Sequence, residues 1–149
     1  MRKHFDKELY KKYDTAAKAA AEKLFENSAW TIKISEKKTA VDYQVFEGDK
    51  HIAYLEVEVK MNWNVKDFPY TDVQWPERKW KYTQLDKPTI FLMFNHDLSQ
   101  YLTAPGKALL NSKLEIVRNK YVRYGEQFFK VPVSEVTFND VHSQIRGLE

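Results

Sequence analysis

The sequence predicts an α/β domain in which a central mixed β-sheet is flanked by helices on both faces. Three observations lead to this prediction. Residues 5–27 repeat apolar side chains every three or four positions, as an amphipathic helix does. Residues 30–60 contain runs in which apolar and polar side chains alternate, which is typical of strands. Residues 88–94 form a continuous apolar run, which predicts a strand covered on both faces.

The composition is that of one globular domain. With 149 residues, of which 43% are hydrophobic, the chain can bury a core and is assigned to a single domain, 1–149. The absence of cysteine excludes disulfides and thiolate zinc sites. Residues 1–14 lack the apolar core of a signal peptide, and no apolar run has the length of a membrane span. We therefore expect an intracellular, cytoplasmic protein without a membrane partner.

The first helix is expected over residues 5–27 and the first strand over residues 30–35. The apolar positions of the helix are Leu9, Tyr13, Ala16, Ala17, Ala20 and Leu24. The alanines favour helix formation and allow close approach to a sheet. In the strand, Trp30, Ile32 and Ile34 alternate with polar residues.

Residues 40–60 are predicted to form a β-hairpin that turns at Gly48 and Asp49. Odd-numbered positions are mostly apolar in both arms, so odd positions must pair with odd positions if the two apolar sets share a core. This register requires an odd-length loop or a bulge near the turn. A three-residue loop, 48–50, satisfies it and sets Asp42 opposite Glu56, with Glu58 as its diagonal neighbour.

Asp42, Glu56, Glu58 and Lys60 would then share one face of the hairpin. A solvated polar face is one interpretation, since any half-exposed hairpin alternates in this way. The other interpretation starts from charge: three carboxylates repel one another, and Lys60 compensates only one of them. A hard divalent cation with all-oxygen ligation would remove the repulsion, which indicates Mg²⁺.

Asp42 followed by Glu58-Val59-Lys60 at the end of a hairpin resembles the signature of the PD-(D/E)xK, or restriction-endonuclease-like, nuclease superfamily. Within it, residues 23–60 most resemble the archaeal-type Holliday junction resolvases, because a helix end, a strand, a polar link and two hairpin strands follow in the same order. The chain departs from the pattern twice. Val41 replaces the proline before the aspartate, and Lys18 stands where the resolvases usually carry a metal-binding glutamate.

Glu22 and Asp14, one helical turn on either side of Lys18, are candidate substitutes for that glutamate. For each of them a solvated helix charge is the alternative interpretation. The resemblance covers about the first 60 residues well and the remainder only in outline.

The resemblance implies a magnesium-dependent DNA endonuclease, with Mn²⁺ as a substitute, that cleaves branched DNA in recombination or repair as a homodimer. Asp42, Glu58 and Lys60 are its expected catalytic residues. Asp42 and Glu58 would hold the metal, with Glu56 and Glu22 as further ligands, and Lys60 would orient the attacking water. The products would be a 5′-phosphate and a 3′-hydroxyl. If Glu56 and Glu58 formed the metal pair instead, Lys60 would lie outside the site.

DNA contacts are expected from basic clusters around the chain, whose net charge is +3. Pro76 suits the first turn of a short basic helix. The candidate contacts are Arg78, Lys79 and Lys81 on this helix, with Lys66, Lys11 and Lys12 elsewhere. Residues 61–76 lack a regular period and are rich in aromatic side chains, which would either stack on bases or cover the sheet.

The rest of the chain is predicted to complete the sheet. Pro105 and Gly106 indicate a turn, 114–117 and 128–131 short edge or supporting strands, and 141–149 a tail. Some aromatic side chains are expected at a dimer interface; the candidates are Trp63, Trp75, Trp80, Phe128 and Phe129. Two alternatives to a junction resolvase stay open: a non-catalytic nucleic-acid-binding module on the same fold, and a nuclease that acts on other DNA.

Overall fold

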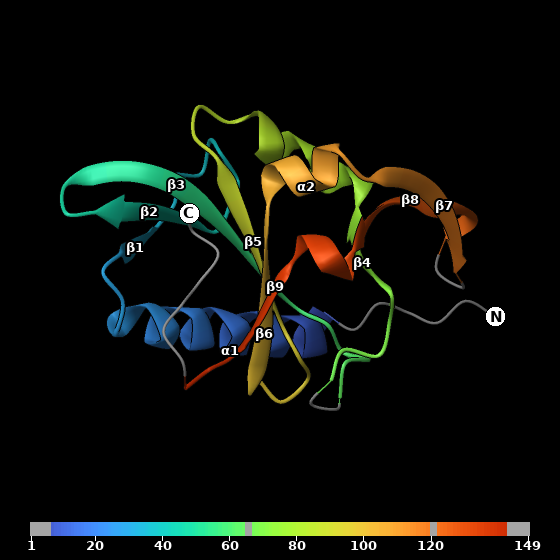
Figure 1. Ribbon diagram of the computed structural model, residues 1–149, viewed down its shortest axis with the longest axis horizontal. Helices are drawn as coiled ribbons and strands as arrows, with labels where there is room; N and C mark the ends of the chain where they lie inside the picture. Colours follow the sequence, from blue (N-terminus) through green and yellow to red (C-terminus); the bar gives the residue numbers. More distant parts are fainter. Residues whose placement is uncertain (1–6, 65–66, 120–121, 143–149) are drawn as a thin grey trace.

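The computed structural model describes residues 7–64, 67–119 and 122–142, and these form a mixed α/β fold built on two β-sheets (Figure 1). The elements in chain order are α1 (Lys7–Glu26), β1 (Thr31–Ile34), β2 (Tyr43–Glu47), β3 (Lys50–Val59), β4 (Asp72–Pro76), the 3₁₀ helix η1 (Glu77–Gln84), β5 (Thr89–Phe94), β6 (Gln100–Pro105), α2 (Gly106–Leu110), β7 (Lys113–Asn119), β8 (Val122–Pro132), the 3₁₀ helix η2 (Val133–Glu135) and β9 (Thr137–Asp140).

The larger sheet has six strands in the order β1-β2-β3-β5-β6-β9. Its strands β3 and β5 are parallel, and all its other neighbours are antiparallel. The smaller sheet is antiparallel, in the order β4-β8-β7. The prediction of a central mixed sheet is confirmed.

Helix α1 covers one face of the larger sheet (Figure 1). Ala17, Ala21, Leu24 and Phe25 of the helix are buried against this face. The residues that meet them are the odd-numbered ones of β2 and β3 and the even-numbered ones of β5, as the two-residue period of a strand requires. The small alanines let the helix approach the strands closely, and the predicted amphipathic helix is confirmed over the described residues.

The opposite face is covered differently from the expectation of helices on both sides. The smaller sheet packs here through Val73, Trp75, Phe129 and Val131, together with η1 and the five-residue α2. A second core forms between the two sheets, with Phe91 of the larger sheet fully buried in it. The second layer is therefore mainly a β-sheet rather than a layer of helices.

The parallel pairing of β3 and β5 determines what lies over this second face. Parallel neighbours need a crossover connection, because the chain must return to the starting end of the sheet. Here the connection carries β4 and η1, and β4 joins β8 in the smaller sheet. The basic helix η1 is thereby placed over the even-numbered residues of β3.

The hairpin register is as predicted, but the turn differs. Tyr43 pairs with Leu55 and Val45 with Ala53, so extension of the register sets residue 42 opposite residue 56. Glu47 pairs with Lys50, which leaves a two-residue turn in place of the expected three-residue loop. The required parity comes from a bulge on β3, where Ile52 is the extra residue opposite Val45 and Phe46 of β2. Gly48 adopts φ +60, which favours glycine at this turn.

The later segments agree with the sequence in part. All residues of β5 are buried, as the apolar run predicts. The predicted strands 114–117 and 128–131 lie within β7 and β8. Strands β4, β6 and β9 were not predicted, and the expected turn at Pro105 and Gly106 is instead the junction of β6 with α2. A Cβ on Gly106 would lie 3.3 Å from the Thr89 carbonyl oxygen, so close packing explains this glycine.

None of the helices in the described ranges is long and apolar enough to cross a membrane. Of the predicted tail, residues 143–149 lie outside the described part of the chain, and Val141 packs against the core beneath α1.

Candidate functional site

Asp42, Glu56 and Glu58 lie near one another where the two arms of the hairpin end, and we call these three residues the carboxylate row. Glu56 and Glu58 are successive even-numbered residues of β3, beside Phe91 and Met93 of β5 in the parallel register. Asp42 immediately precedes β2 on the opposite side of β3. The row is thus bordered by buried apolar side chains on one side and by η1 above.

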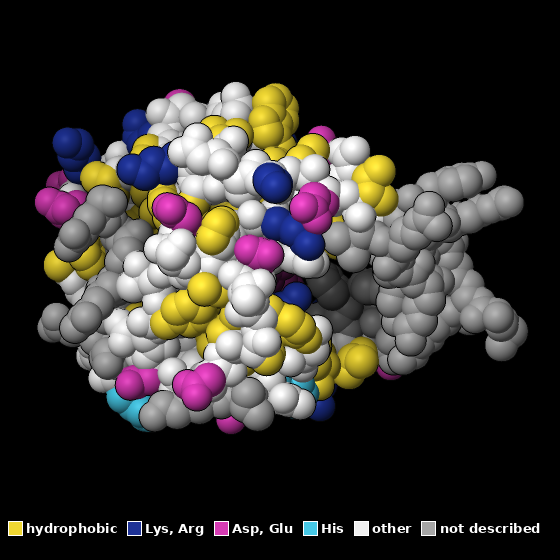
Figure 2. All heavy atoms as spheres, turned by 45° about the vertical axis from the view of Figure 1, so that its right-hand side comes forward, with side chains coloured by type: hydrophobic (Ala, Val, Ile, Leu, Met, Phe, Trp, Pro, Cys, Tyr) yellow, Lys and Arg dark blue, Asp and Glu magenta, His cyan; other side chains and the backbone are white. Residues whose placement is uncertain are grey.

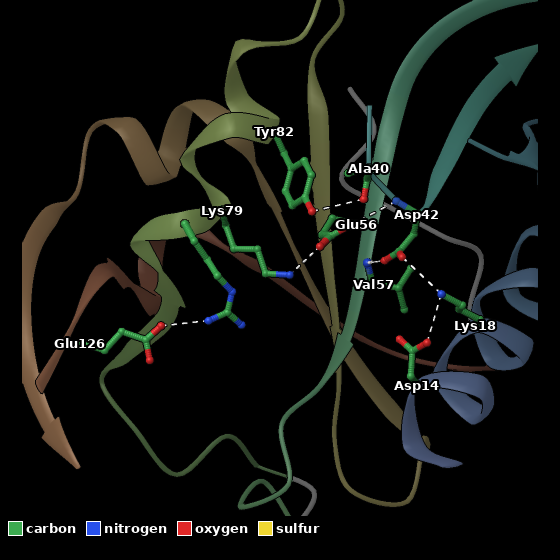
Figure 3. Close-up of polar contacts among 10 residues, drawn as sticks. Asp14, Lys18, Ala40, Asp42, Glu56, Val57, Lys79, Tyr82 and Glu126 are labelled. Carbon is green, nitrogen blue, oxygen red and sulfur yellow. Dashed lines mark hydrogen bonds and ion pairs between the residues drawn. The ribbon is translucent and has the colours of Figure 1, made fainter. Parts of the chain in front are cut away.

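Asp42 is held by both the sheet and α1 (Figure 3). Its Oδ2 accepts a hydrogen bond of 2.8 Å from the Val57 backbone N–H. Its Oδ1 lies 3.5 Å from Lys18 Nζ, which also pairs with Asp14 at 3.1 Å. The Tyr43 hydroxyl donates to the Lys18 carbonyl oxygen at 3.4 Å, which links this turn of α1 to β2. One ammonium therefore links two carboxylates from different elements.

Glu56 forms the tightest ion pair of the row. Its Oε2 lies 2.5 Å from Lys79 Nζ, and its Oε1 accepts a 3.3 Å hydrogen bond from the Asp42 backbone N–H. The residue is only 4% exposed, so a solvated polar face does not describe this position. Burial raises the pKa of Glu56 to about 7, although Lys79 acts in the opposite direction. Burial alone would lower the pKa of Lys79, but the carboxylates of Glu56 and Glu58 outweigh it and raise that pKa.

Glu58 carries a carboxylate oxygen that has no partner among the described residues. Its Oε1 is buried and has no hydrogen-bond partner among the described residues. Burial raises the pKa of Glu58, while Lys79, Lys60 and Arg78 act to lower it. An unpaired buried carboxylate destabilises a fold unless a cation or a proton compensates it. Glu58 is thus the position in the row with unsatisfied ligand capacity.

Lys60 lies at the end of β3, two residues beyond Glu58. Its Nζ is 5.4 Å from the centroid of the Tyr70 ring, a cation–π contact, and its backbone N–H donates to the Phe94 carbonyl oxygen at 2.8 Å. Burial lowers the pKa of Lys60, and Glu58 partly opposes this effect. A lysine in this setting loses its proton more readily than a solvated one.

The backbone before Asp42 is strained. Ala40 has φ +60, a left-handed conformation that disfavours residues with a Cβ. The Tyr82 hydroxyl of η1 donates to the Ala40 carbonyl oxygen at 3.2 Å, and the Ser35 N–H donates to the Asp42 carbonyl oxygen at 3.1 Å. These contacts from two directions hold the strained residue and direct Asp42 toward β3 (Figure 3).

The other predicted site residues are more dispersed. Glu22 interacts with the Tyr43 hydroxyl on the far side of the hairpin, and burial with the Glu22 carboxylate raises the pKa of Tyr43. Arg78 pairs with Glu126 of β8 at 2.9 Å and stays largely exposed. Lys81 is exposed beside the Tyr82 ring. Lys11 and Lys12 are exposed on α1, and Lys66 lies outside the described residues.

Lys79, expected at the DNA backbone, is directed inward instead. Its side chain is 15% exposed and its ammonium is engaged with Glu56. Figure 2 shows basic and acidic side chains mixed around a hollow on one face of the molecule, rather than a surface of one charge.

The aromatic residues of 61–76 mostly cover the sheet. Trp63 and Trp75 are fully buried. Trp63 meets Phe68 edge to face at a centroid distance of 5.2 Å, and Phe68 in turn contacts Tyr70 at 5.6 Å. Tyr70 keeps an exposed face beside Lys60. Both tryptophans therefore cover the sheet, which is one of the two functions considered for this segment. Of its aromatic residues, only Tyr70 is exposed enough to stack on a base.

The carboxylate oxygens of the row are ligands that a hard cation prefers, but they do not form a complete coordination site. Within the described ranges, no three His, Cys, Asp or Glu side chains form a ready-made metal group. The contacts explain why: Lys18 engages Asp42, and Lys79 engages Glu56. All-oxygen ligation by Glu58 and Asp42, completed by water, is nevertheless the arrangement that Mg²⁺ accepts with few protein ligands.

Sequence reasoning did not predict the roles of Lys18, Lys79 and Tyr82 at this site. For Lys18 a signal existed, because it occupies the helix position where the resembled enzymes carry an acid. For Lys79 and Tyr82 no local pattern was informative, since their contacts cross from η1 to the hairpin and depend on the β3–β5 crossover.

No protein-family model matches the chain, and no curated protein sequence matches it.

Proposed function

We propose that the protein is a magnesium-dependent DNA endonuclease of the restriction-endonuclease-like type, acting on branched DNA as the resembled resolvases do. The observation that carries the proposal is the buried, unpaired Oε1 of Glu58. Glu58 lies two residues before Lys60 and near Asp42, which precedes the neighbouring strand. The same three residues make up the signature of the resembled enzymes. A fold without need of a cation gains nothing from such a carboxylate.

In this function Asp42 and Glu58 would hold the ion, with Mn²⁺ as a substitute for Mg²⁺. The bound ion would supply an acidified water and stabilise charge on the scissile phosphate. Lys60 would bind and orient the phosphate or the water through Nζ and offset developing negative charge. Met93 of β5 is buried beside Glu58 in the parallel register and forms an apolar border of the site. Lys79 keeps Glu56 engaged, so Glu56 supports the backbone of Asp42 rather than the ion.

A second candidate function has an observation in its favour. Lys18 and Lys79 already compensate Asp42 and Glu56, so two of the three charges in the row are balanced without metal. A non-catalytic nucleic-acid-binding module on the same fold would use such pairs as structural contacts.

The discriminating experiment is a cleavage assay with Mg²⁺, and with EDTA, on a four-way junction, a flap, linear duplex and single-stranded DNA. We expect Mg²⁺-dependent cleavage, strongest on the branched substrates. Asp42→Asn and Glu58→Gln should each abolish cleavage while leaving DNA binding intact or tighter, because negative charge near phosphates is removed. Asp49→Asn removes one exposed carboxylate from the hairpin turn and serves as the matched control.

Full cleavage by Glu58→Gln would place the catalytic centre elsewhere. DNA binding without cleavage on every substrate, unaffected by Mg²⁺, would favour the non-catalytic module. Cleavage of linear duplex or single strands in preference to the junction would keep the nuclease and change its substrate.

A homodimer is part of the same proposal, since a junction presents two strands related by two-fold symmetry. Among the aromatic interface candidates, Trp63, Trp75 and Phe129 are buried in the chain's own cores, whereas Trp80 is 49% exposed. Phe128 is half-buried, so Trp80 is the candidate with the most side-chain surface available to a partner.

A further inference from the structure

Lys18 occupies a position between two carboxylates that would otherwise form one end of a cation site. Its Nζ lies 3.1 Å from Asp14 Oδ2 on α1 and 3.5 Å from Asp42 Oδ1 at the start of the hairpin. The Tyr43 hydroxyl binds the Lys18 carbonyl oxygen at 3.4 Å, which ties this turn of the helix to the sheet. The Lys18 ammonium is thus engaged by two carboxylates, while 39% of its side-chain surface stays exposed.

Asp42 and Glu56, which lie opposite each other in the carboxylate row, are compensated in the same manner. Lys18 supplies a positive charge at Asp42, and Lys79 supplies one at Glu56. Beside them, the buried Oε1 of Glu58 has no partner among the described residues. Two places of the row are therefore filled by ammonium groups of the chain, and one place is left for a cation from solution.

We propose that Lys18 acts as a built-in cation that limits the centre to a single divalent ion at Glu58 and Asp42. This inference rests on the proposed metal-dependent function and specifies its stoichiometry. An ammonium carries one charge and cannot acidify a bound water as a divalent ion does, so the chain relies on one ion for that purpose. Replacing Lys18 by an acid would surround the same place with Asp14, residue 18 and Asp42, all with oxygen donors.

The test is to count bound Mn²⁺ by equilibrium dialysis and by electron paramagnetic resonance in the wild type and in Lys18→Glu. We expect one ion per wild-type chain and two per Lys18→Glu chain. Lys18→Met, which removes the charge without adding an oxygen donor, should bind one ion. Lys23→Glu applies the same charge reversal on the same helix away from the row and should also bind one.

Lys18→Glu brings three carboxylates together and could lower stability without metal, so its folding is followed by circular dichroism during the same titration. Folding on addition of Mn²⁺ with two ions per chain gives the same support as a folded variant that binds two. Adding Asp14→Asn to Lys18→Glu removes one donor and should return the count to one.

The outcomes separate this inference from the proposed function. One ion in both the wild type and Lys18→Glu overturns the inference alone, as do two ions in the wild type. No Mn²⁺ in the wild type and in Lys18→Glu overturns the inference and the metal-dependent function together.

Discussion

Replacing Lys79 by methionine should destabilise the protein in a strongly pH-dependent manner. The substitution keeps most of the apolar stem and removes the ammonium 2.5 Å from Glu56 Oε2. The two side chains are 15% and 5% exposed, so solvent screening of the pair is weak. Without Lys79, Glu56 keeps its hydrogen bond from the Asp42 backbone N–H but has no cation paired with it among the described residues. A carboxylate in this position must then be buried as an uncompensated charge or take up a proton.

The size of the effect can be worked from the structure. The pKa of Glu56 rises from 4.5 to about 7 in the fold even with Lys79 present, which corresponds to roughly 3 kcal/mol against the ionised form. Because the folded state then binds more protons than the unfolded one, stability falls as the pH rises from 4.5 to about 7. Removing Lys79 raises this pKa further and extends the fall to higher pH. We expect Lys79→Met to lose about 3 kcal/mol at pH 9 and less than about 1 kcal/mol at pH 5.

The assay is urea unfolding followed by circular dichroism at pH 5, 7 and 9. Lys81→Met, on the same 3₁₀ helix but exposed, is the matched control and should change stability by less than about 0.5 kcal/mol at each pH. Combining Lys79→Met with Glu56→Gln removes both charges and should recover most of the stability at pH 9. An equal loss at pH 5 and pH 9 would refute the reasoning, because it would show that Lys79 contributes through packing of its stem and not through its charge.

Three further predictions concern strain, DNA contacts and the metal ligand. Ala40→Gly should raise the free energy of unfolding by about 1 kcal/mol because glycine adopts the left-handed conformation without penalty; Ala29→Gly, without this conformation, should not stabilise the chain. Arg78→Ala should reduce the slope of log Kd against log salt by about one, measured by fluorescence anisotropy, whereas an unchanged slope would exclude a phosphate contact. Glu58→Gln should stabilise the metal-free protein above pH 7, since the raised pKa of Glu58 means that its ionised form destabilises the fold; equal stability of variant and wild type at pH 9 would contradict this.

The parts of the fold that could be predicted are those in which one local pattern determines burial. In α1 the apolar repeat predicts a single buried stripe. In the hairpin, apolar residues such as Val45 and Ala53 must pair to share one core, and this requirement determines the register for either kind of turn. A bulge and a three-residue loop satisfy the same parity, so the choice between them could not be made from the pattern.

The smaller sheet could not be predicted with the same certainty, because its strands are short or depend on partners far along the chain. In β4, Val73 and Trp75 do alternate with polar residues, but Pro76 and the surrounding aromatic residues obscured that signal. Its pairing with β8 joins segments more than fifty residues apart, for example Trp75 with Phe129. No local period reports such a contact.

The candidate site was likewise predicted only where a local pattern determines it. The proximity of Asp42 to Glu56 followed from the hairpin register and was predicted. The lysines that compensate these carboxylates come from α1 and η1, which meet the hairpin only through the packing of the whole fold. The sequence thus located the negative charges of the site, while the positions of the matching positive charges required the structure.

This division bears on the choice between the two candidate functions. A module that needs only a stable face would be expected to treat all three carboxylates alike, either by pairing each with a lysine or by leaving each in solvent. In this chain Asp42 and Glu56 are paired, whereas Glu58, the sheet neighbour of Met93, has a buried Oε1 without a hydrogen-bond partner among the described residues. Lys60 is near enough to lower the pKa of Glu58 but does not form an ion pair with it among the contacts of the described residues. Structural pairing accounts for Asp42 and Glu56 but not for Glu58, and the cation that we propose would compensate Glu58.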